Sequence, residues 1–303
     1  MVAKGSPARA VRLTVVAIAA AAALAGCDIN NTLGGFGWPG GGVTKQSTAM
    51  YDMWFWSVVA ALAVGVFVWG LIFWCTTRYR KRGDELPEQT RFNLPIEVLY
   101  TVLPVLVIAV LFYYTAVAQT NVNKVSANPD VTVEVVAFKW NWQFNYRSGP
   151  QLTPQSDAKT VASTTGSSEY IPILVIPTNR TIRFEETSKD VIHSFWVPEM
   201  LFKRDVFPAS KNGVARNVFE ITAQQEGRYV GRCAELCGTY HSMMNFEVIT
   251  VSPDKYDKYV AALAAGKSSP EALELIGFTG APGTVTSPFA YTTKPFDTKR
   301  QQS

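Results

Sequence analysis

The chain has 303 residues, of which 48% are hydrophobic and 17% charged, and its formal net charge is +4. This mild positive charge is found largely in segments that flank apolar runs, so it does not indicate a nucleic-acid-binding protein. The apolar residues are concentrated in three runs near the N-terminus, which is typical of a membrane protein and excludes one large soluble core.

Residues 1–26 predict a lipoprotein signal peptide. A basic start is followed by an apolar stretch, residues 13–23, that is too short to span a bilayer comfortably. The following Leu-Ala-Gly-Cys27 sequence resembles the bacterial lipobox, which predicts lipidation of Cys27 after cleavage. The alternative is a small-residue cleavage site without lipidation. The glycine-rich composition of residues 33–42 predicts that residues 27–49 form a flexible linker.

Two transmembrane helices are predicted within residues 50–120. Residues 51–77 and 94–118 are both apolar enough, and long enough, to cross the hydrocarbon core. The connecting loop, residues 78–94, begins with four basic residues in a five-residue stretch, so the positive-inside rule places it in the cytoplasm. The chain is therefore expected to be a multi-pass protein of a bacterial plasma membrane, with everything after Gln119 on the outer side.

Residues 128–252 predict a β-sandwich, because short β-rich runs alternate with turn residues. The expected strands are residues 131–136, 171–176, 181–184, 218–221, 228–231 and 245–251. Residues 147–169 form a Ser/Thr/Gly-rich insert in which no packed element is expected. Residues 253–303 are expected to form two short helices, 254–263 and 270–276, and a tail.

Five aromatic residues alternate with polar residues between positions 138 and 146. In one continuous strand, all five rings would lie on the same face. For most of these rings, the simplest interpretation is half of a sandwich core. The five residues are Phe138, Trp140, Trp142, Phe144 and Tyr146.

A short stretch near position 240 contains a set of soft metal ligands. Cys233, Cys237, His241 and Met244 supply two thiolates, an imidazole and a thioether, a set that suits copper better than calcium or magnesium. The chain has only two histidines, and the second, His193, precedes a strand-like run. One blue copper needs a single cysteine, so the second cysteine favours two copper ions bridged by both thiolates. Each ion would then take one imidazole.

The remaining ligands of such a pair are a weak thioether from Met244 and a backbone carbonyl, for which Glu235 is placed between the cysteines. Two other interpretations exist. Paired cysteines in an exported domain often form a disulfide. A structural zinc site of Cys and His ligands is also possible, although it has no need of Met244.

The motif Gly-Arg-Cys-Ala-Glu-Leu-Cys-Gly-x-x-His-Ser-x-Met, residues 231–244, with His-Ser-x-x-Val-Pro upstream, resembles subunit II of haem–copper cytochrome c oxidases. The resemblance covers about residues 50 to 250. It implies a membrane-anchored all-β protein: a two-helix transmembrane hairpin followed by a cupredoxin-like Greek-key β-sandwich. It also implies that the ligand set binds the binuclear copper centre called CuA, with the ligands on loops at one end of the sandwich.

The resemblance implies roles for four further residues. Trp140 matches the tryptophan that receives the donor's electron, and Glu97 matches a glutamate at the mouth of a proton channel. Asp205 lies in a segment that contacts the catalytic subunit in the family. The Glu235 side chain could reach a magnesium or manganese ion shared with that subunit. Asn141, with Asn145, replaces an aromatic and an acidic residue common in better-known members, which disfavours a free, lysine-rich cytochrome c as donor.

The expected function is electron transfer in a bacterial aa3-type oxidase of the actinobacterial kind. The chain would accept electrons from cytochrome c, or from a membrane-bound cytochrome c of a bc complex, and pass them to subunit I, which reduces oxygen and pumps protons. The chain lacks the histidines to reduce oxygen by itself and has no Cys-x-x-Cys-His haem motif. The alternative is a membrane-tethered cupredoxin electron carrier without an oxidase partner.

Overall fold

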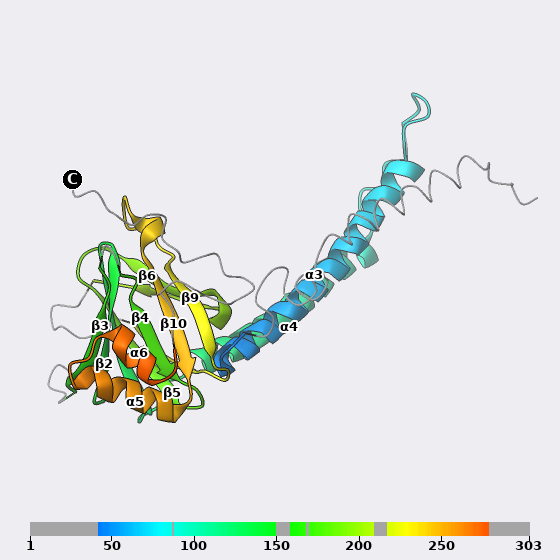
Figure 1. Ribbon diagram of the computed structural model, residues 1–303. Helices are drawn as coiled ribbons and strands as arrows, with labels where there is room; N and C mark the ends of the chain where they lie inside the picture. Colours follow the sequence, from blue (N-terminus) through cyan, green and yellow to red (C-terminus); the bar gives the residue numbers. More distant parts are fainter. Residues whose placement is uncertain (1–41, 87, 150–157, 168–169, 209–216, 279–303) are drawn as a thin grey trace, which may run out of the picture.

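The computed structural model describes residues 42–86, 88–149, 158–167, 170–208 and 217–278. Two long helices, α3 and α4, run side by side and extend from one end of a β domain (Figure 1). Two short helices, α5 and α6, lie against the β domain. The predicted fold class, a two-helix hairpin followed by a two-sheet β domain, is confirmed.

Helix α3 spans Lys45–Arg78 and helix α4 spans Leu94–Val122. Both are long and apolar enough to cross a membrane, and they contain the two predicted spans. Thr44 caps α3 by accepting a hydrogen bond from the Ser47 backbone, and the Ser47 hydroxyl accepts one from the Thr44 backbone in return. Pro104 lies inside α4, where a membrane environment with neighbouring helices tolerates the missing donor.

The residues just before and inside α3 are attached to the β domain. The Val43 N–H donates to the Glu199 carbonyl at 3.1 Å, and the Val43 carbonyl accepts from Gln224 at 2.9 Å. The Gln46 side chain accepts from the Thr222 N–H at 3.0 Å. The prediction that the linker is flexible through residue 49 is therefore wrong for its last residues, because backbone pairing fixes them. Cys27 and the predicted signal peptide lie outside the described residues.

In the described residues, the β domain consists of two five-stranded sheets, whose strand pairs are antiparallel except β1–β5 and β10–β4. The first sheet has the order β3 (Thr160–Thr165), β2 (Asn141–Arg147), β1 (Val131–Phe138), β5 (Thr181–Ser188), β8 (Asn217–Thr222). The second has the order β4 (Ile173–Pro177), β10 (Asn245–Val251), β9 (Gly227–Cys233), β6 (His193–Val197), β7 (Phe202–Val206).

An aromatic core lies between the sheets. Trp142 and Phe144 are fully buried on β2, and both rings pack edge-on against Phe246 of β10, at centroid distances of 5.2 and 5.5 Å. Phe195 of β6 stacks on the same Phe246 ring at 4.7 Å. Strands from both sheets therefore supply one continuous apolar interior, as expected for a sandwich whose alternate side chains point inward.

Two predictions about this domain are wrong. Residues 138–146 are not one strand: β1 ends at Phe138 and β2 begins at Asn141, so Trp140 lies in the turn of a hairpin and outside the core face. The insert 147–169 does contain a packed element, because strand β3 lies within it and pairs with β2. The residues of β3 are mostly small and polar, so its buried and exposed positions do not differ in hydrophobicity, and the composition of the insert did not indicate a strand.

The two C-terminal helices, α5 (Pro253–Ala264) and α6 (Ser269–Leu275), match the predicted ones to within one residue at each end. Tyr256 and Tyr259 of α5 both pack edge-on against Tyr146 of β2, each with a ring-centroid distance of 6.2 Å. Arg180 binds Asp257 of α5 with two hydrogen bonds, at 2.7 and 2.8 Å. These contacts hold α5 across the β domain.

Candidate metal centre

Strand pairing brings the two predicted ligand segments together. His193 is the first residue of β6, and Cys233 is the last residue of β9, which pairs with β6 through Phe195 and Cys233. The loop after Cys233 is closed by the Cys233 N–H, which donates to the Met244 carbonyl at 3.0 Å. The prediction that the ligands lie on loops is therefore wrong for His193 and Cys233, which lie at strand ends.

Each cysteine sulfur in the cluster has an imidazole beside it. The two Sγ atoms are 3.8 Å apart. Cys233 Sγ lies 3.8 Å from His193 Nδ1, and Cys237 Sγ lies 3.5 Å from His241 Nδ1. Met244 Sδ lies 3.8 Å from Cys237 Sγ, and the Glu235 carbonyl lies 3.3 Å from Cys233 Sγ. Each cysteine sulfur is thus paired with its own imidazole, as expected of a site for two metal ions.

The disulfide interpretation does not fit this arrangement. A disulfide joins its sulfurs at about 2.05 Å, whereas these sulfurs are 3.8 Å apart and both cysteines are free. The donor atoms of His193, Cys233 and Cys237 all lie within 4.8 Å of one another, and all three residues are buried. Met244 is fully buried beside them. Thiolate, imidazole and thioether donors together fit copper, while a four-ligand zinc site has no need of the thioether.

Burial shifts the pKa of two residues in the cluster, Cys237 and His193. Burial, followed by the effect of the neighbouring Cys233, raises the pKa of Cys237 to about 12. Burial also lowers the pKa of His193, although its hydrogen bond to Asp190 opposes that shift. Both shifts favour the neutral form, so Cys237 keeps its thiol proton at physiological pH until a cation displaces it.

Asp190 orients His193, a role that the sequence did not indicate. Its Oδ1 lies 2.8 Å from His193 Nε2, which leaves Nδ1 facing Cys233. Burial would raise the pKa of Asp190, but hydrogen bonds from His193 and from the Lys139 and Val191 backbones outweigh it and lower the pKa. The Lys139 N–H donates at 2.7 Å. Such a carboxylate fixes the ring and raises the basicity of the metal-binding nitrogen.

Trp140 lies against the cluster and not in the sandwich core. Its indole Nε1 donates to the carbonyl of Cys237 at 3.1 Å, and its ring meets Tyr240 edge-on at a centroid distance of 5.0 Å. The indole is half-buried. Trp142, two residues along, is the fully buried neighbour: its Nε1 donates to the Met244 carbonyl at 3.3 Å, and its ring lies 6.2 Å from that of His193.

The other predicted site residues lie apart from these contacts. The Glu235 side chain is exposed, although its carbonyl belongs to the cluster. Asp205 of β7 accepts a hydrogen bond from Ser194, the neighbour of His193, at 2.9 Å. Glu97 is in the first turn of α4, on the membrane hairpin. Cys27 lies outside the described residues.

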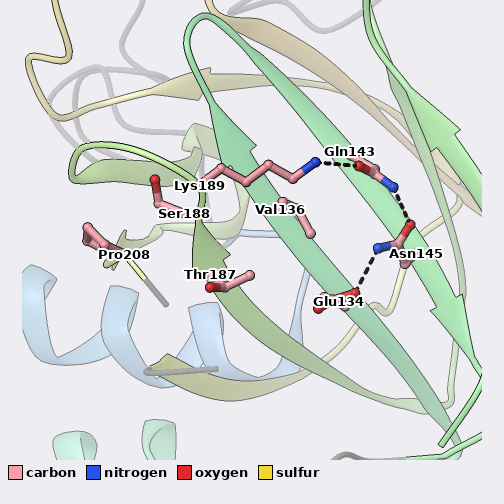
Figure 2. A pocket seen from close by; sticks show the side chains of 8 residues that line it. All are labelled: Glu134, Val136, Gln143, Asn145, Thr187, Ser188, Lys189 and Pro208. Carbon is pink, nitrogen blue, oxygen red and sulfur yellow. Dashed lines mark hydrogen bonds between the residues drawn. The ribbon is translucent and has the colours of Figure 1, made fainter. Parts of the chain in front are cut away.

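The two asparagines that depart from the family pattern have structural partners. The Asn141 amide donates to the Ser167 carbonyl at 2.8 Å. Asn145 donates to Glu134 at 2.7 Å and accepts from Gln143 at 2.9 Å, and Gln143 in turn accepts from Lys189 at 3.4 Å. Figure 2 shows the hydrogen bonds that join Lys189, Gln143, Asn145 and Glu134. These four side chains line part of an open groove of about 520 Å³. Both asparagines are thus held within the first sheet.

Comparison with known proteins gives matches over both parts of the chain. The family model for the periplasmic domain of cytochrome c oxidase subunit II matches residues 131–251, and the model for its transmembrane domain matches residues 44–116. A probable cytochrome c oxidase subunit 2 of Nocardia farcinica is 44% identical over 91% of this chain and 85% of that protein.

Two further comparisons concern a relative and a solved structure. The cytochrome c oxidase subunit 2 of Mycobacterium tuberculosis is 38% identical over 98% of this chain and 92% of that protein. The periplasmic domain of subunit II of the Bradyrhizobium japonicum cytochrome oxidase is 22% identical, covering 48% of this chain and 100% of that chain, with a TM-score of 0.37. The full-length relatives carry the assignment, since they span hairpin and β domain alike.

Proposed function

This chain belongs to the cytochrome c oxidase subunit II family, and we propose that it receives electrons at a binuclear copper centre and passes them to the catalytic subunit. The observation that supports this proposal is the pair of unlinked buried thiols, each with an imidazole beside it. When bound, the copper pair supplies one-electron relay chemistry. Oxygen reduction and proton pumping would take place in the neighbouring subunit I.

The residues of the cluster fit that group in kind and in number. Cys233, Cys237, His193 and His241 would hold the two ions through their thiolate and imidazole groups. Met244 and the Glu235 carbonyl would complete the set as weak ligands. Asp190 would hold the His193 ring in its binding tautomer, and the buried surroundings would keep water from the sulfurs.

Copper content and electron paramagnetic resonance of the purified full-length protein test the proposal. Two copper atoms per chain and a mixed-valence dinuclear signal are expected. Cys233→Ser should remove that signal, whereas Cys75→Ser should leave it unchanged, because Cys75 is an exposed cysteine on α3. A single mononuclear copper, or zinc in its place, would contradict the dinuclear assignment.

Trp140 is proposed as the residue that receives the donor's electron. Its half-buried indole is hydrogen-bonded to the carbonyl of Cys237, which supports a direct route from the surface to a copper ligand. Trp140→Phe should slow reduction of the copper by cytochrome c far more than electron flow out of the copper. Unchanged reduction in this variant would place the receiving residue elsewhere.

Glu97 is proposed as a group at the opening of the proton channel into subunit I. It lies in the first turn of α4, where its side chain accepts a hydrogen bond from the Asn93 backbone at 2.9 Å. An ionisable group at a span's edge is a fair candidate for proton uptake. Glu97→Gln should slow proton uptake by the assembled oxidase and leave the copper spectrum unchanged. Equal turnover in both forms would refute this role.

Glu235 is proposed to bind a magnesium or manganese ion at the boundary with subunit I. Its carbonyl is part of the cluster while its side chain is exposed, so one residue could serve both sites. Hard cations of this kind prefer carboxylate oxygen. Glu235→Gln should abolish the manganese resonance of oxidase grown with manganese but retain the copper signal. Retention of both signals would exclude the side chain as a ligand.

Membrane attachment is proposed to include a lipid on Cys27 in addition to the two helices, in a bacterial plasma membrane with the β domain outside. Intact-mass analysis of the protein, compared with Cys27→Ser, tests the modification. The electron donor is proposed to be cytochrome c, free or held in the membrane by a bc complex. Co-purification of a bc complex with the oxidase in mild detergent would favour the membrane-held donor, and its consistent absence would favour the free one.

A further inference from the structure

Trp140 does not belong to a strand, so strand pairing does not fix the position of its indole. It lies in the turn between β1 and β2, beyond the last paired residues Phe138 and Asn141. Side chains in a strand are directed by the pleat, whereas a turn residue depends on contacts made by its ring. For Trp140, two ring contacts come from the loop that contains the copper ligands: the Cys237 carbonyl accepts its indole N–H at 3.1 Å, and Tyr240 meets its ring edge-on.

Gly238 and Tyr240, which follow Cys237 in the loop, shape the space around that indole. Gly238 has a φ of +119°, and a Cβ built there would lie 3.2 Å from Cζ2 of Trp140, so the absence of a side chain leaves room for the ring. Tyr240 meets the indole at an interplanar angle of 84° and a centroid distance of 5.0 Å. Its edge-to-face geometry is the favourable arrangement for two aromatic quadrupoles.

We propose that Tyr240 is a positioning residue for electron transfer, which holds the Trp140 indole against the Cys237 carbonyl. The hydrogen bond from Nε1 joins the surface ring to the peptide of a copper ligand. If the ring rotated away, that contact would be lost, although the copper ligands themselves would be unchanged. This inference rests on the proposed role of Trp140. It adds that the rate of electron transfer depends on the ring at position 240.

The test compares Tyr240→Leu, Tyr240→Phe and Thr239→Ala in the complete oxidase. Thr239 is the exposed neighbour in the same loop, so its variant controls for changes in the loop. Reduction of the copper centre by reduced cytochrome c is followed by stopped flow over a range of donor concentrations, and the copper resonance is recorded for each variant. The rate at saturating donor reports transfer, and the half-saturating concentration reports docking.

Tyr240→Leu should slow the saturated rate by about two- to tenfold, the factor that corresponds to the loss of one aromatic pair. The half-saturating concentration and copper resonance should stay unchanged. Tyr240→Phe keeps the ring and should restore the parent rate, and Thr239→Ala should match the parent.

Three results would overturn the inference. If Tyr240→Leu matched the parent rate while Trp140→Phe was slow, Trp140 would need no support from the ring at position 240. Equal slowing by Tyr240→Phe would assign the effect to the hydroxyl and not to the ring. Loss of copper in Tyr240→Leu would make Tyr240 a residue that forms the site. Failure of the proposed function is distinguishable, because the parent itself would then lack the dinuclear signal.

Discussion

The membrane hairpin exposes its apolar side chains, whereas the β domain buries them in its interior. On α3, Phe73 and Leu62 are 62% and 54% exposed, while in the β domain Phe195 is 1% exposed and Trp142 is fully buried. Lipid and neighbouring subunits must complete the surroundings of the first pair, and the chain itself surrounds the second. The β domain therefore fixes the metal ligands by its own packing, whereas the hairpin attaches that domain to the membrane.

The β domain also buries polar groups. These include His193 and the Arg183–Glu220 ion pair, whose side-chain nitrogen and oxygen are 2.8 Å apart. The attachment of α3 through Val43 and of α4 through Asn123, which accepts from Arg204 at 2.7 Å, joins the two regions outside the membrane. Matched substitutions in the two regions should therefore have unequal effects.

The largest difference is expected for removal of the same ring from each region. Phe195→Ala deletes a buried ring that stacks on Phe246, and should lower the free energy of unfolding by about 3–5 kcal/mol and weaken copper binding. Phe73→Ala removes an exposed ring from α3 and should leave the β domain's thermal unfolding unchanged. Near-ultraviolet circular dichroism of the detergent-solubilised protein measures both. Equal losses would show that the β domain depends on the hairpin for its stability.

A smaller difference is expected for removal of one carboxylate from each region. Asp190→Ala deletes the oxygen that orients His193, and should lower copper affinity by about 10- to 100-fold. Glu97→Gln changes the carboxylate of α4 and should leave copper affinity unchanged. Competition with a copper chelator measures both constants. Unaltered affinity in Asp190→Ala would mean that the imidazole is oriented without it.

How far the sequence predicts the structure also differs between the two regions. Apolar length alone predicted both membrane helices, because lipid selects for composition over a fixed distance. The ligand residues of the cluster could be predicted because soft donors at those spacings have few other uses. His193, forty residues before Cys233, could be selected because the chain has only two histidines, but only the pairing of β6 with β9 brings it beside Cys233.

The remaining features depended on contacts that composition does not record. Trp140 continues an aromatic alternation, and nothing local shows that the hairpin turns there and directs the ring to Cys237. In the sequence, Asp190 cannot be told from an ordinary turn residue. Its role is evident only from its contact with the His193 ring in the fold. The β3 strand has a polar sequence, and its pairing with β2 is a tertiary effect.

A buried carboxyl group in the β domain is expected to make the stability of the folded protein depend on pH. Glu186 is fully buried, and neither of its carboxyl oxygens has a hydrogen-bond partner in the described part of the chain. Burial raises its pKa well above the ordinary value; Arg204 opposes this shift, and Asp205 adds to it. The folded protein therefore keeps a proton that the unfolded chain releases above about pH 4.3, so stability is lost as the pH rises.

Glu186→Gln removes that titration. The thermal midpoint of the variant should fall less than that of the parent between pH 5 and pH 8, and the variant should be the more stable of the two at neutral pH. Glu85→Gln, in the exposed loop between α3 and α4, should follow the parent at every pH. Differential scanning calorimetry at constant ionic strength measures the three curves. A Glu186→Gln curve parallel to that of the parent would show that the buried group ionises in the folded protein.

The smallest difference is expected between two ion pairs. Arg180 and Asp257 join the β domain to α5 through two hydrogen bonds, and Asp257 is 56% exposed; Lys81 and Asp84 meet at 2.8 Å in the loop of the hairpin with Asp84 fully exposed. The hydrogen bond from Arg180 lowers the pKa of Asp257, so its contribution is present above the unfolded value and lost as the pH falls through the folded one. Solvent screening limits that contribution to about 0.2–1 kcal/mol. Asp257→Asn should therefore lower the thermal midpoint slightly at low salt and less at high salt, and Asp84→Asn should not change it, because both side chains of the Lys81–Asp84 pair are exposed to solvent.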